Sequence, residues 1–418
     1  MIKQYLIQAW RLLKENPLLS SISIIGTALA ICMIMVMVMS HEVENASAPP
    51  ESNRDRMLYM KFANSRPKGD SLQSGSSGGL AYELAKEGFK ELQTPETVSI
   101  ATIYEPSALA SIPANKKATS VSIKLTDAEF WEVFDLSFIA GKPYTKVDVD
   151  AGLRKVVITE GTARKVFGAT DVIGQTILLN YTDYTVCGVV KDVSYLFSNA
   201  YSQVWAPLTS QDIHVSDDLI VGCYQAFILA KNSADFPVIR EEVEKLRNQY
   251  NGGLPDKDAH YMGQPDVHYV ASKRFSSNTP PNIKYINRQF FIVIALLLIV
   301  PAINLSSMTG SRMRKRMSEL GVRRAYGATQ SNVFTQVIWE SLLQTIIGGI
   351  IGLILSIIAA YLLKGLIFDG AVVDITLLLR PIVFLYALLF CLLLNLLSAI
   401  IPAWRASRNF IVDSILLK

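Results

Sequence analysis

Residues 18–39 read LLSSISIIGTALAICMIMVMVM, an apolar run without one charged side chain. A helix needs roughly 20 such residues to cross the ~30 Å hydrocarbon core of a bilayer, so this run predicts a transmembrane helix over residues 18–40. The whole chain has 418 residues, of which 50% are hydrophobic and 18% are charged. Soluble domains carry about 25% charged residues. The deficit is concentrated in a few long apolar runs, which indicates an integral membrane protein.

A cleaved signal peptide is the alternative interpretation of this first apolar run. Basic residues precede it, and residues 46–48 read Ala-Ser-Ala, which resembles a cleavage site. The run is longer than the usual h-region of about 7–15 residues, and Pro49 makes a poor cleavage context. We therefore expect an uncleaved anchor. Residues 1–17 before it predict an amphipathic helix along the cytoplasmic membrane surface.

Three further apolar runs follow a long polar stretch. They predict a membrane α-helical protein with four transmembrane helices, at residues 18–40, 286–310, 334–364 and 382–402. The segments between and after them are a large outer domain at 41–285, loops at 311–333 and 365–381, and a tail at 403–418. No span carries an acid or a base at its centre, which argues against a carrier coupled to protons or ions.

Lysine and arginine predict the orientation, because they accumulate in cytoplasmic loops. The basic residues fall in the N-terminal tail (Lys3, Arg11, Lys14), the loop 311–333 (Arg312, Arg314, Lys315, Arg316, Arg323, Arg324) and the C-terminal tail (Arg405, Arg408, Lys418). Four spans put all three segments on one side of the membrane, whereas an odd number would separate them. We therefore expect cytoplasmic termini, a cytoplasmic loop 311–333, an extracytoplasmic loop 365–381 and an extracytoplasmic domain 41–285.

Small residues in the third predicted span indicate close helix packing. Gly348 and Gly352 form a small-xxx-small pair, and Gly349 lies beside the first of them. This spacing lets helices approach closely in membranes. Glu340 is an acid near the start of the same span. The alternative is that the glycines are merely tolerated.

The outer domain predicts an α+β fold with two lobes. Residues 46–53 form a Pro/Ser linker, and a strand–helix–strand order then occurs twice, which is typical of a ferredoxin-like lobe. Its predicted strands are 56–62, 97–104, 224–230 and 267–271, and its helices are 80–92 and 236–250, after a Gly/Ser-rich loop at 69–79. A second α+β lobe is inserted, with strands 119–124, 155–158, 176–179 and 185–190 and helices 127–134 and 160–167.

Motifs for catalysis or cofactor binding are absent from the sequence. The chain has no GxxxxGK[ST] loop for ATP, and His41-Glu42 lacks the second histidine of HExxH because Asn45 is in its place. No Cys/His cluster predicts a metal site, and a disulfide between Cys187 and Cys223 is left open. The net charge of +4 largely flanks apolar runs, which argues against nucleic-acid binding. We expect no enzyme activity and no bound cofactor in this chain.

The strongest local feature is the loop sequence SELGVRRAYGAT at residues 318–329. Val322 and Ala325 can share one apolar helical face, Gly327 suits a helix C-cap, and Thr329 suits the N-cap of the next helix. This pattern predicts a compact helix between two spans that transmits force from a cytoplasmic partner. The alternative is a plain connecting loop whose charges only orient the chain.

This loop resembles the E-[IL]-G-[IV]-R-[KR]-A-x-G-A-[ST] motif of MacB/FtsX-type ABC permeases. The matching residues are Glu319, Gly321, Arg323, Arg324, Ala325, Gly327, Ala328 and Thr329. Glu340 and Gly348-Gly349 resemble the family's acid and glycines in the following span. Residues 127–193 resemble the MacB-type periplasmic core, from Phe130-Trp131-Glu132-Val133-Phe134 to Gly188-Val189-Val190-Lys191-Asp192-Val193. One departure is Ile411, where the family often has proline, and it concerns only the tail.

The resemblance implies a permease of the bacterial inner membrane without a fused ATPase domain. Its outer part would be a MacB-like core with a porter-type lobe at about 54–105 and 215–275 and an inserted lobe at about 106–210. Such permeases dimerise with a second copy or a paralogue, and their coupling helix contacts separate cytoplasmic ATPase subunits that bind ATP and magnesium. ATP-driven motion is then transmitted to the outer domain.

The leading function under this resemblance is efflux or export of peptides, toxins or antibiotics, with a periplasmic adaptor and an outer-membrane channel. The alternatives are FtsX-like signalling to cell-wall hydrolases and lipoprotein extraction of the Lol type. The large two-lobed core disfavours signalling, since FtsX has a smaller and different outer domain.

Overall fold

A computed structural model describes residues 17–69, 75–113, 115–211, 218–315 and 329–367, together with isolated positions in 7–15, 322–327 and 385–400. The chain divides into two compact units. Residues 44–283 form the body of one unit, and residues up to 43 and from 284 to 367 belong to the other.

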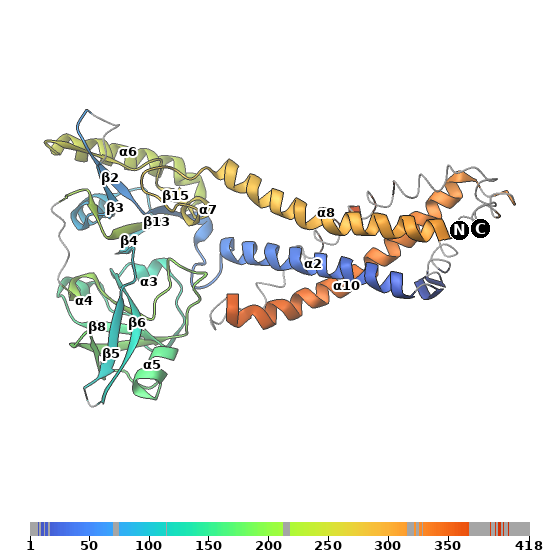
Figure 1. Cartoon of the computed structure of the whole chain (residues 1–418). Helices are drawn as coiled ribbons and strands as arrows, with labels where there is room; N and C mark the ends of the chain where they lie inside the picture. Colours follow the sequence, from blue (N-terminus) through green and yellow to red (C-terminus); the bar gives the residue numbers. More distant parts are fainter. Residues whose placement is uncertain are drawn as a thin grey trace. The chain divides into compact units, whose positions relative to one another are not determined.

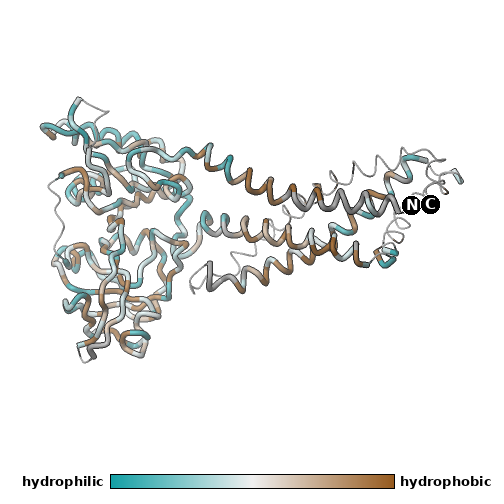
Figure 2. The backbone as a smooth tube through the Cα atoms, viewed as in Figure 1, coloured by the Kyte–Doolittle hydropathy of each residue, from teal (hydrophilic) through white to brown (hydrophobic). Residues whose placement is uncertain are grey.

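Among the described residues, the long helices of the second of these units are α2 (Pro17–Asn45), α8 (Ile283–Lys315) and α10 (Gln330–Ile367), as Figure 1 shows. Within the described residues, two stretches are long and apolar enough to cross a membrane, Ser20–Met39 and Gln330–Ala359. Brown, hydrophobic backbone marks both helices in Figure 2. The predicted fourth span and the tail lie almost wholly outside the described residues, as does most of the predicted N-terminal amphipathic helix. The four-span topology therefore stays a prediction.

The outer domain contains one continuous sheet with helices packed against it (Figure 1). Its strands are β1 (Met57–Met60), β2 (Ala63–Pro67), β3 (Ser76–Leu80), β4 (Thr97–Thr102), β5 (Ser107–Ile112), β6 (Asn115–Thr126), β7 (Phe138–Gly141), β8 (Lys155–Thr159), β9 (Thr176–Leu179), β10 (Thr182–Val190), β11 (Val204–Pro207), β12 (Val221–Gly222), β13 (Tyr224–Leu229), β14 (Lys257–His260) and β15 (Asp266–Val267). Its helices are α3 (Phe130–Val133), α4 (Lys146–Asp150), α5 (Glu160–Phe167), α6 (Phe236–Gly253) and α7 (His268–Ser272), with short turns at Leu84–Gly88 and Phe89–Glu91.

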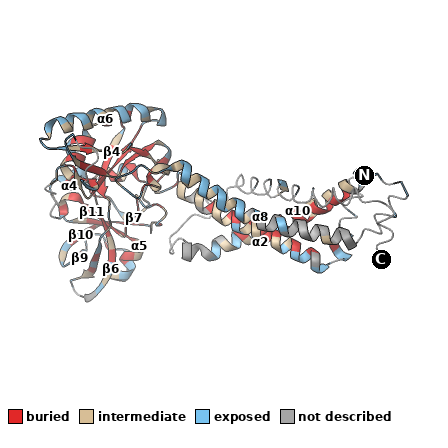
Figure 3. Cartoon of the chain, turned by 45° about the horizontal axis from the view of Figure 1, so that its top comes forward, coloured by how far each residue is buried: buried red, intermediate tan, exposed pale blue. Residues whose placement is uncertain are grey.

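The two predicted lobes share this sheet and part of its core. The strand order β11-β8-β10-β9-β5-β6-β4-β13-β3-β2-β14 passes from one lobe to the other where Ala101 of β4 pairs with Thr126 of β6. One apolar cluster lies under α6, whose Ile239 and Val243 are buried while its outer side is exposed (Figure 3). A second cluster lies within residues 108–206. A third joins the lobes, because it combines side chains such as Phe227 and Trp205.

Local pattern predicted many of these elements. The helix at 160–167 and the strand at 176–179 were predicted with the bounds of α5 and β9. The sequence also predicted the central strands β1, β4, β8 and β13 to within a few residues.

Two predictions in the outer domain were wrong. In place of the predicted strand 267–271, the two-residue strand β15 is followed by helix α7, whose buried residues His268 and Ala271 are spaced three apart, as on one helical face. The predicted loop 69–79 includes strand β3. The predicted helix 80–92, by contrast, is found as a continuous helical segment over residues 82–91, which includes the π-helical turn Leu84–Gly88 and the 3-10 turn Phe89–Glu91. Strand β3 was missed because its glycines are typical of a loop. The fold requires glycine at one of them, since a Cβ on Gly79 would lie 2.6 Å from the Tyr224 carbonyl oxygen.

Cysteine chemistry is also decided by the structure. Cys187 and Cys223 are free thiols, so the disulfide that the sequence left open is not formed. The Cys187 thiol donates a hydrogen bond to the Val156 carbonyl oxygen instead.

Candidate functional site

The first candidate site is the loop between α8 and α10. The Tyr326 N–H donates a hydrogen bond to the Val322 carbonyl oxygen at 3.0 Å, which closes one helical turn. Gly327 follows with a φ of +98°, the left-handed conformation expected of a C-cap glycine. Thr329 Oγ1 accepts a hydrogen bond from the Asn332 N–H at 3.3 Å, as an N-cap does.

Two described side chains of this segment, Val322 and Tyr326, are exposed. Val322 is 46% exposed and Tyr326 is 89% exposed. An apolar side chain and an aromatic side chain on a capped turn give a surface suited to a protein partner. The remaining predicted coupling residues lie outside the described residues: Glu319, Gly321, Arg323, Arg324, Ala325 and Ala328.

The second candidate feature is the contact between α2 and α10. A Cβ on Gly348 would lie 2.9 Å from Thr27 Cβ, and a Cβ on Gly352 would lie 2.7 Å from the Ala28 carbonyl oxygen. The two helices therefore touch at backbone distance, as the small-xxx-small spacing predicts. Residue numbers increase together along the contact: Gly348 lies against Thr27, and Gly352 lies against Ala28 and Ile31. The helices α2 and α10 therefore run parallel.

Polar residues follow the same contact along α10. Gln336, Glu340, Gln344 and Ser356 recur at multiples of four residues, in line with the two glycines, and all four are buried. Gly349 is buried as well. Buried hydroxyls on α2 include Thr27, whose Oγ1 donates to the Ser23 carbonyl oxygen. Polar side chains between membrane helices act as interhelical hydrogen-bonding groups.

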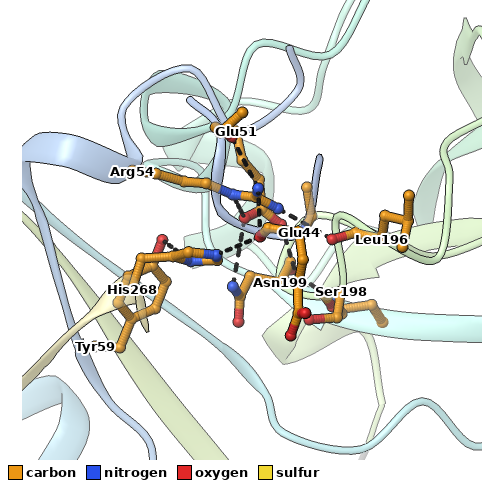
Figure 4. A network of polar contacts seen from close by, with 11 residues as sticks. Glu44, Glu51, Arg54, Tyr59, Leu196, Ser198, Asn199 and His268 are labelled. Carbon is orange, nitrogen blue, oxygen red and sulfur yellow. Dashed lines mark hydrogen bonds and ion pairs between the residues drawn. The ribbon is translucent and has the colours of Figure 1, made fainter. Parts of the chain in front are cut away.

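A third site, which the sequence did not predict, lies where the outer domain begins (Figure 4). Arg54 and Glu51 form a buried ion pair with 2.8 Å between Nε and Oε2, and their side chains are 1% and 0% exposed. Arg54 Nη1 also donates to the backbone carbonyls of Glu44 and Ala46 at 2.9 and 2.8 Å. Arg54 Nη2 donates to the Leu196 carbonyl oxygen at 3.0 Å.

The Glu51 carboxylate connects this pair to the inserted lobe. Its Oε1 accepts hydrogen bonds from the backbone N–H groups of Asn199 and Ala200 at 3.0 and 3.1 Å. Its Oε2 accepts from Asn199 Nδ2 at 3.4 Å. A buried carboxylate needs such donors, because an unpaired charge in the interior is very costly.

His268 connects the same site to α7 and β1. Its Nε2 lies 2.9 Å from the Glu44 carbonyl oxygen, and its Nδ1 lies 3.3 Å from the Tyr59 hydroxyl. Burial, followed by the charge of Arg54, lowers the pKa of His268. Beyond α7, Lys273 Nζ pairs with the Glu44 carboxylate at 2.6 Å. We call Glu44, Glu51, Arg54, Tyr59, His268 and Lys273 the junction cluster.

A cavity of about 230 Å³ lies beside the junction cluster, with Tyr59, His268 and the loop residues Leu196 and Asn199 in its wall. Lys61 also lines it, and burial together with the charge of Lys124 lowers the pKa of this lysine. Across the described residues, no group of three or more histidine, cysteine, aspartate or glutamate side chains is placed to bind a metal ion.

Sequence reasoning missed the junction cluster for a simple reason. Residues 46–53 read as a linker because they are short, polar and contain Pro49 and Pro50. No spacing rule links Glu51 to Asn199 or Glu44 to His268, because hydropathy patterns report only neighbours in the chain. The one local signal is Glu51 three residues before Arg54, which many exposed segments share.

Apolar helices joined to an α+β domain of this size define a broad class: a protein with membrane-type helices and one large domain outside them. Two family profiles match the chain, the MacB-like periplasmic core domain over residues 20–246 and the FtsX-like permease C-terminal domain over residues 291–409. The chain therefore belongs to the MacB/FtsX-type ABC transporter permeases, which confirms the resemblance seen in the loop and in the core.

Curated relatives carry the name macrolide export ATP-binding/permease protein MacB. The protein of Chromobacterium violaceum is 23% identical over 349 residues, which cover 83% of this chain and 50% of that protein. MacB 1 of Yersinia pestis is 22% identical over 418 residues, which cover 99% of this chain and 60% of that protein. The chain thus spans roughly half of the length of the relatives that it matches.

Solved structures of two outer domains are also similar to this chain. The periplasmic region of MacB from Actinobacillus actinomycetemcomitans covers 49% of this chain and 88% of its own, with 16% identity and a TM-score of 0.36. The extracellular domain of the noncanonic ABC-type transporter YknZ from Gram-positive bacteria covers 48% and 99%, with the same identity and TM-score.

Proposed function

We propose that this chain is the permease subunit of a MacB-like ABC transporter in the bacterial inner membrane. ATP hydrolysis by separate cytoplasmic ATPase subunits, with their magnesium, drives a conformational change of the outer domain. The observation that carries the proposal is the capped turn at residues 322–329 in a chain whose two parts both match this family. A second permease copy or a paralogue completes the dimer.

The proposed orientation has four spans with both termini in the cytoplasm. Parallel packing of α2 and α10 supports it, because their N-terminal ends then lie on the same side of the membrane. The ring of His41, near the end of α2, lies 4.8 Å from that of Phe290 at the beginning of α8, which fits a return through the membrane between them.

The proposed cargo comprises peptides, toxins or antibiotics, exported with a periplasmic adaptor and an outer-membrane channel. The names of the curated relatives support export. The match to the MacB-like periplasmic core domain over residues 20–246 also favours export over FtsX-like signalling.

A charge reversal in the loop tests the ATPase contact. Arg323→Glu combined with Gly327→Pro should leave membrane insertion intact but abolish co-purification with the ATPase and permease-stimulated ATP hydrolysis. Arg11→Glu, the same charge change in the N-terminal tail, is the matched control and should change neither. Unchanged co-purification and unchanged activity in the double variant would refute this coupling role.

A further inference from the structure

We propose that the junction cluster transmits displacement of α2 into both lobes of the outer domain. This inference rests on the proposed function and names the residues through which the two parts of the chain are coupled. The cluster is formed by side chains of residues 44–59 and 268–273, which the fold brings together across more than two hundred positions of sequence.

The end of α2 is fixed to the segment that leads into α8. Glu44 is in the last turn of α2, and its carbonyl oxygen is shared by Arg54 Nη1 and the His268 ring, each at 2.9 Å. The Glu44 carboxylate pairs with Lys273, which follows α7 and precedes α8. A movement of the α2 end therefore acts on both ends of the segment 44–283.

The same cluster reaches both lobes. Tyr59 belongs to β1, so His268 connects the end of α2 to the sheet of the first lobe. Arg54 and Glu51 bind the backbone of residues 196–200 in the inserted lobe. Two neighbouring contacts strengthen that side: Asp135 N–H donates to the Pro50 carbonyl oxygen, and Asn53 Nδ2 donates to the Val133 carbonyl oxygen.

The chemistry of the junction cluster suits transmission of movement between backbone segments better than stabilisation of the fold. A buried ion pair contributes little net stability compared with apolar residues of the same size, because both charges lose their water. The planar guanidinium, however, fixes several acceptors at defined directions in a low-dielectric site. Arg54 uses this geometry to fix the relative positions of the Glu44, Ala46 and Leu196 backbones.

The test is a distance measurement on the full-length permease assembled with its ATPase in lipid. The four native cysteines are changed to alanine, and spin labels are attached at Val238→Cys on α6 and Leu153→Cys before β8. Both positions are exposed, at 54% and 42%, and they belong to different lobes. Distance distributions between the labels are compared with and without ATP, and ATP hydrolysis is measured on the same samples.

The test variant is Arg54→Met with Glu51→Met, which removes both charges together and leaves neither buried alone. We expect ATP hydrolysis to persist and the ATP-dependent change in label distance to be lost. Arg54→Lys, which keeps the charge but not the guanidinium geometry, should restore only part of the change. Lys90→Met is the matched control, because Lys90 pairs with buried Asp127 in the same domain without touching the cluster.

The outcomes separate the two proposals. A distance change that persists in the Arg54→Met/Glu51→Met variant overturns the junction cluster and leaves the proposed function intact. A change lost equally in Lys90→Met assigns the effect to general destabilisation and also overturns the inference. An unsubstituted labelled chain that shows no ATP-dependent change and does not bind the ATPase overturns both proposals.

Discussion

The contact between α2 and α10 and the junction cluster are two buried polar regions built in opposite ways. The helix contact uses glycines and polar residues, among them the acid Glu340, with backbones at direct contact and no ion pair between the described residues of the two helices. The junction cluster uses a buried ion pair and charge-assisted hydrogen bonds to backbone carbonyls. Small residues allow close approach without prescribing a direction, whereas a guanidinium prescribes several directions at once. The first arrangement suits helices that move, and the second suits segments that must move together.

The largest expected effect tests the buried ion pair of the junction cluster. Arg54→Met alone leaves the Glu51 carboxylate buried without its cation and should destabilise the outer domain by about 3–5 kcal/mol. Chemical unfolding of the full chain in detergent, followed by tryptophan fluorescence, measures this loss. The double variant with Glu51→Met should lose less stability than the single variant. Equal losses would show that the pair is solvated rather than buried.

A smaller effect tests the helix contact. Gly352→Leu places a side chain where a Cβ already lies 2.7 Å from the Ala28 carbonyl oxygen, so α2 and α10 must separate. Overpacking of this kind costs about 1–3 kcal/mol. Thermal unfolding in nanodiscs measures it, and Ile354→Leu, a change at an exposed position of α10, is the control. A Gly352→Leu variant as stable as the unsubstituted chain would show that the close approach is dispensable.

The junction cluster should also make the stability of the outer domain depend on pH. Because the pKa of His268 is lowered in the folded chain, the unfolded chain binds a proton that the folded chain does not. Stability should therefore fall as the pH falls through the ordinary histidine pKa of about 6.5. The measurement is the unfolding midpoint at several pH values between about 8 and 5, which bracket the ordinary histidine pKa of roughly 6.5. The slope of the midpoint against pH reports the effect. His268→Gln should flatten the slope.

The smallest expected effect concerns the cap of α10. Thr329→Ala removes the hydroxyl that accepts from the Asn332 N–H and should cost about 1 kcal/mol, whereas Thr329→Ser should be nearly neutral. Hydrogen exchange at the first turn of α10 is the direct measurement. Unchanged exchange protection in Thr329→Ala would mean that this N-cap contributes nothing.

Elements with a strong local period were predictable. Helix α5 alternates its polar and apolar residues with a helical period, between a capping Thr159 and a left-handed Gly168, so its bounds follow from sequence. Strand β3 was not predictable, because its sequence SSGGL has neither alternation nor β-branched residues. Packing against β13 overrides its weak propensity, since the Gly79 backbone lies against Tyr224.

The candidate sites also differ in whether local sequence predicts them. The cap positions Gly327 and Thr329 depend on backbone conformation within a few residues, so residue type predicts them. The close approach at Gly348 and Gly352 follows from a helical repeat. The junction cluster depends on long-range pairs such as Glu51 with Asn199, and no local rule reports them.

By itself, the sequence determined the apolar helices, the basic loop with its glycine and threonine caps, and the membership of the family. Each of these depends on hydrophobicity or backbone preference over short stretches of chain. Only the tertiary structure decided that residues 46–54 contribute buried side chains to a polar cluster rather than forming a linker. It alone also brings Glu44, Arg54 and His268 into contact. A buried charge must find its partners wherever the fold places them, so the identity of those partners is a property of the folded chain.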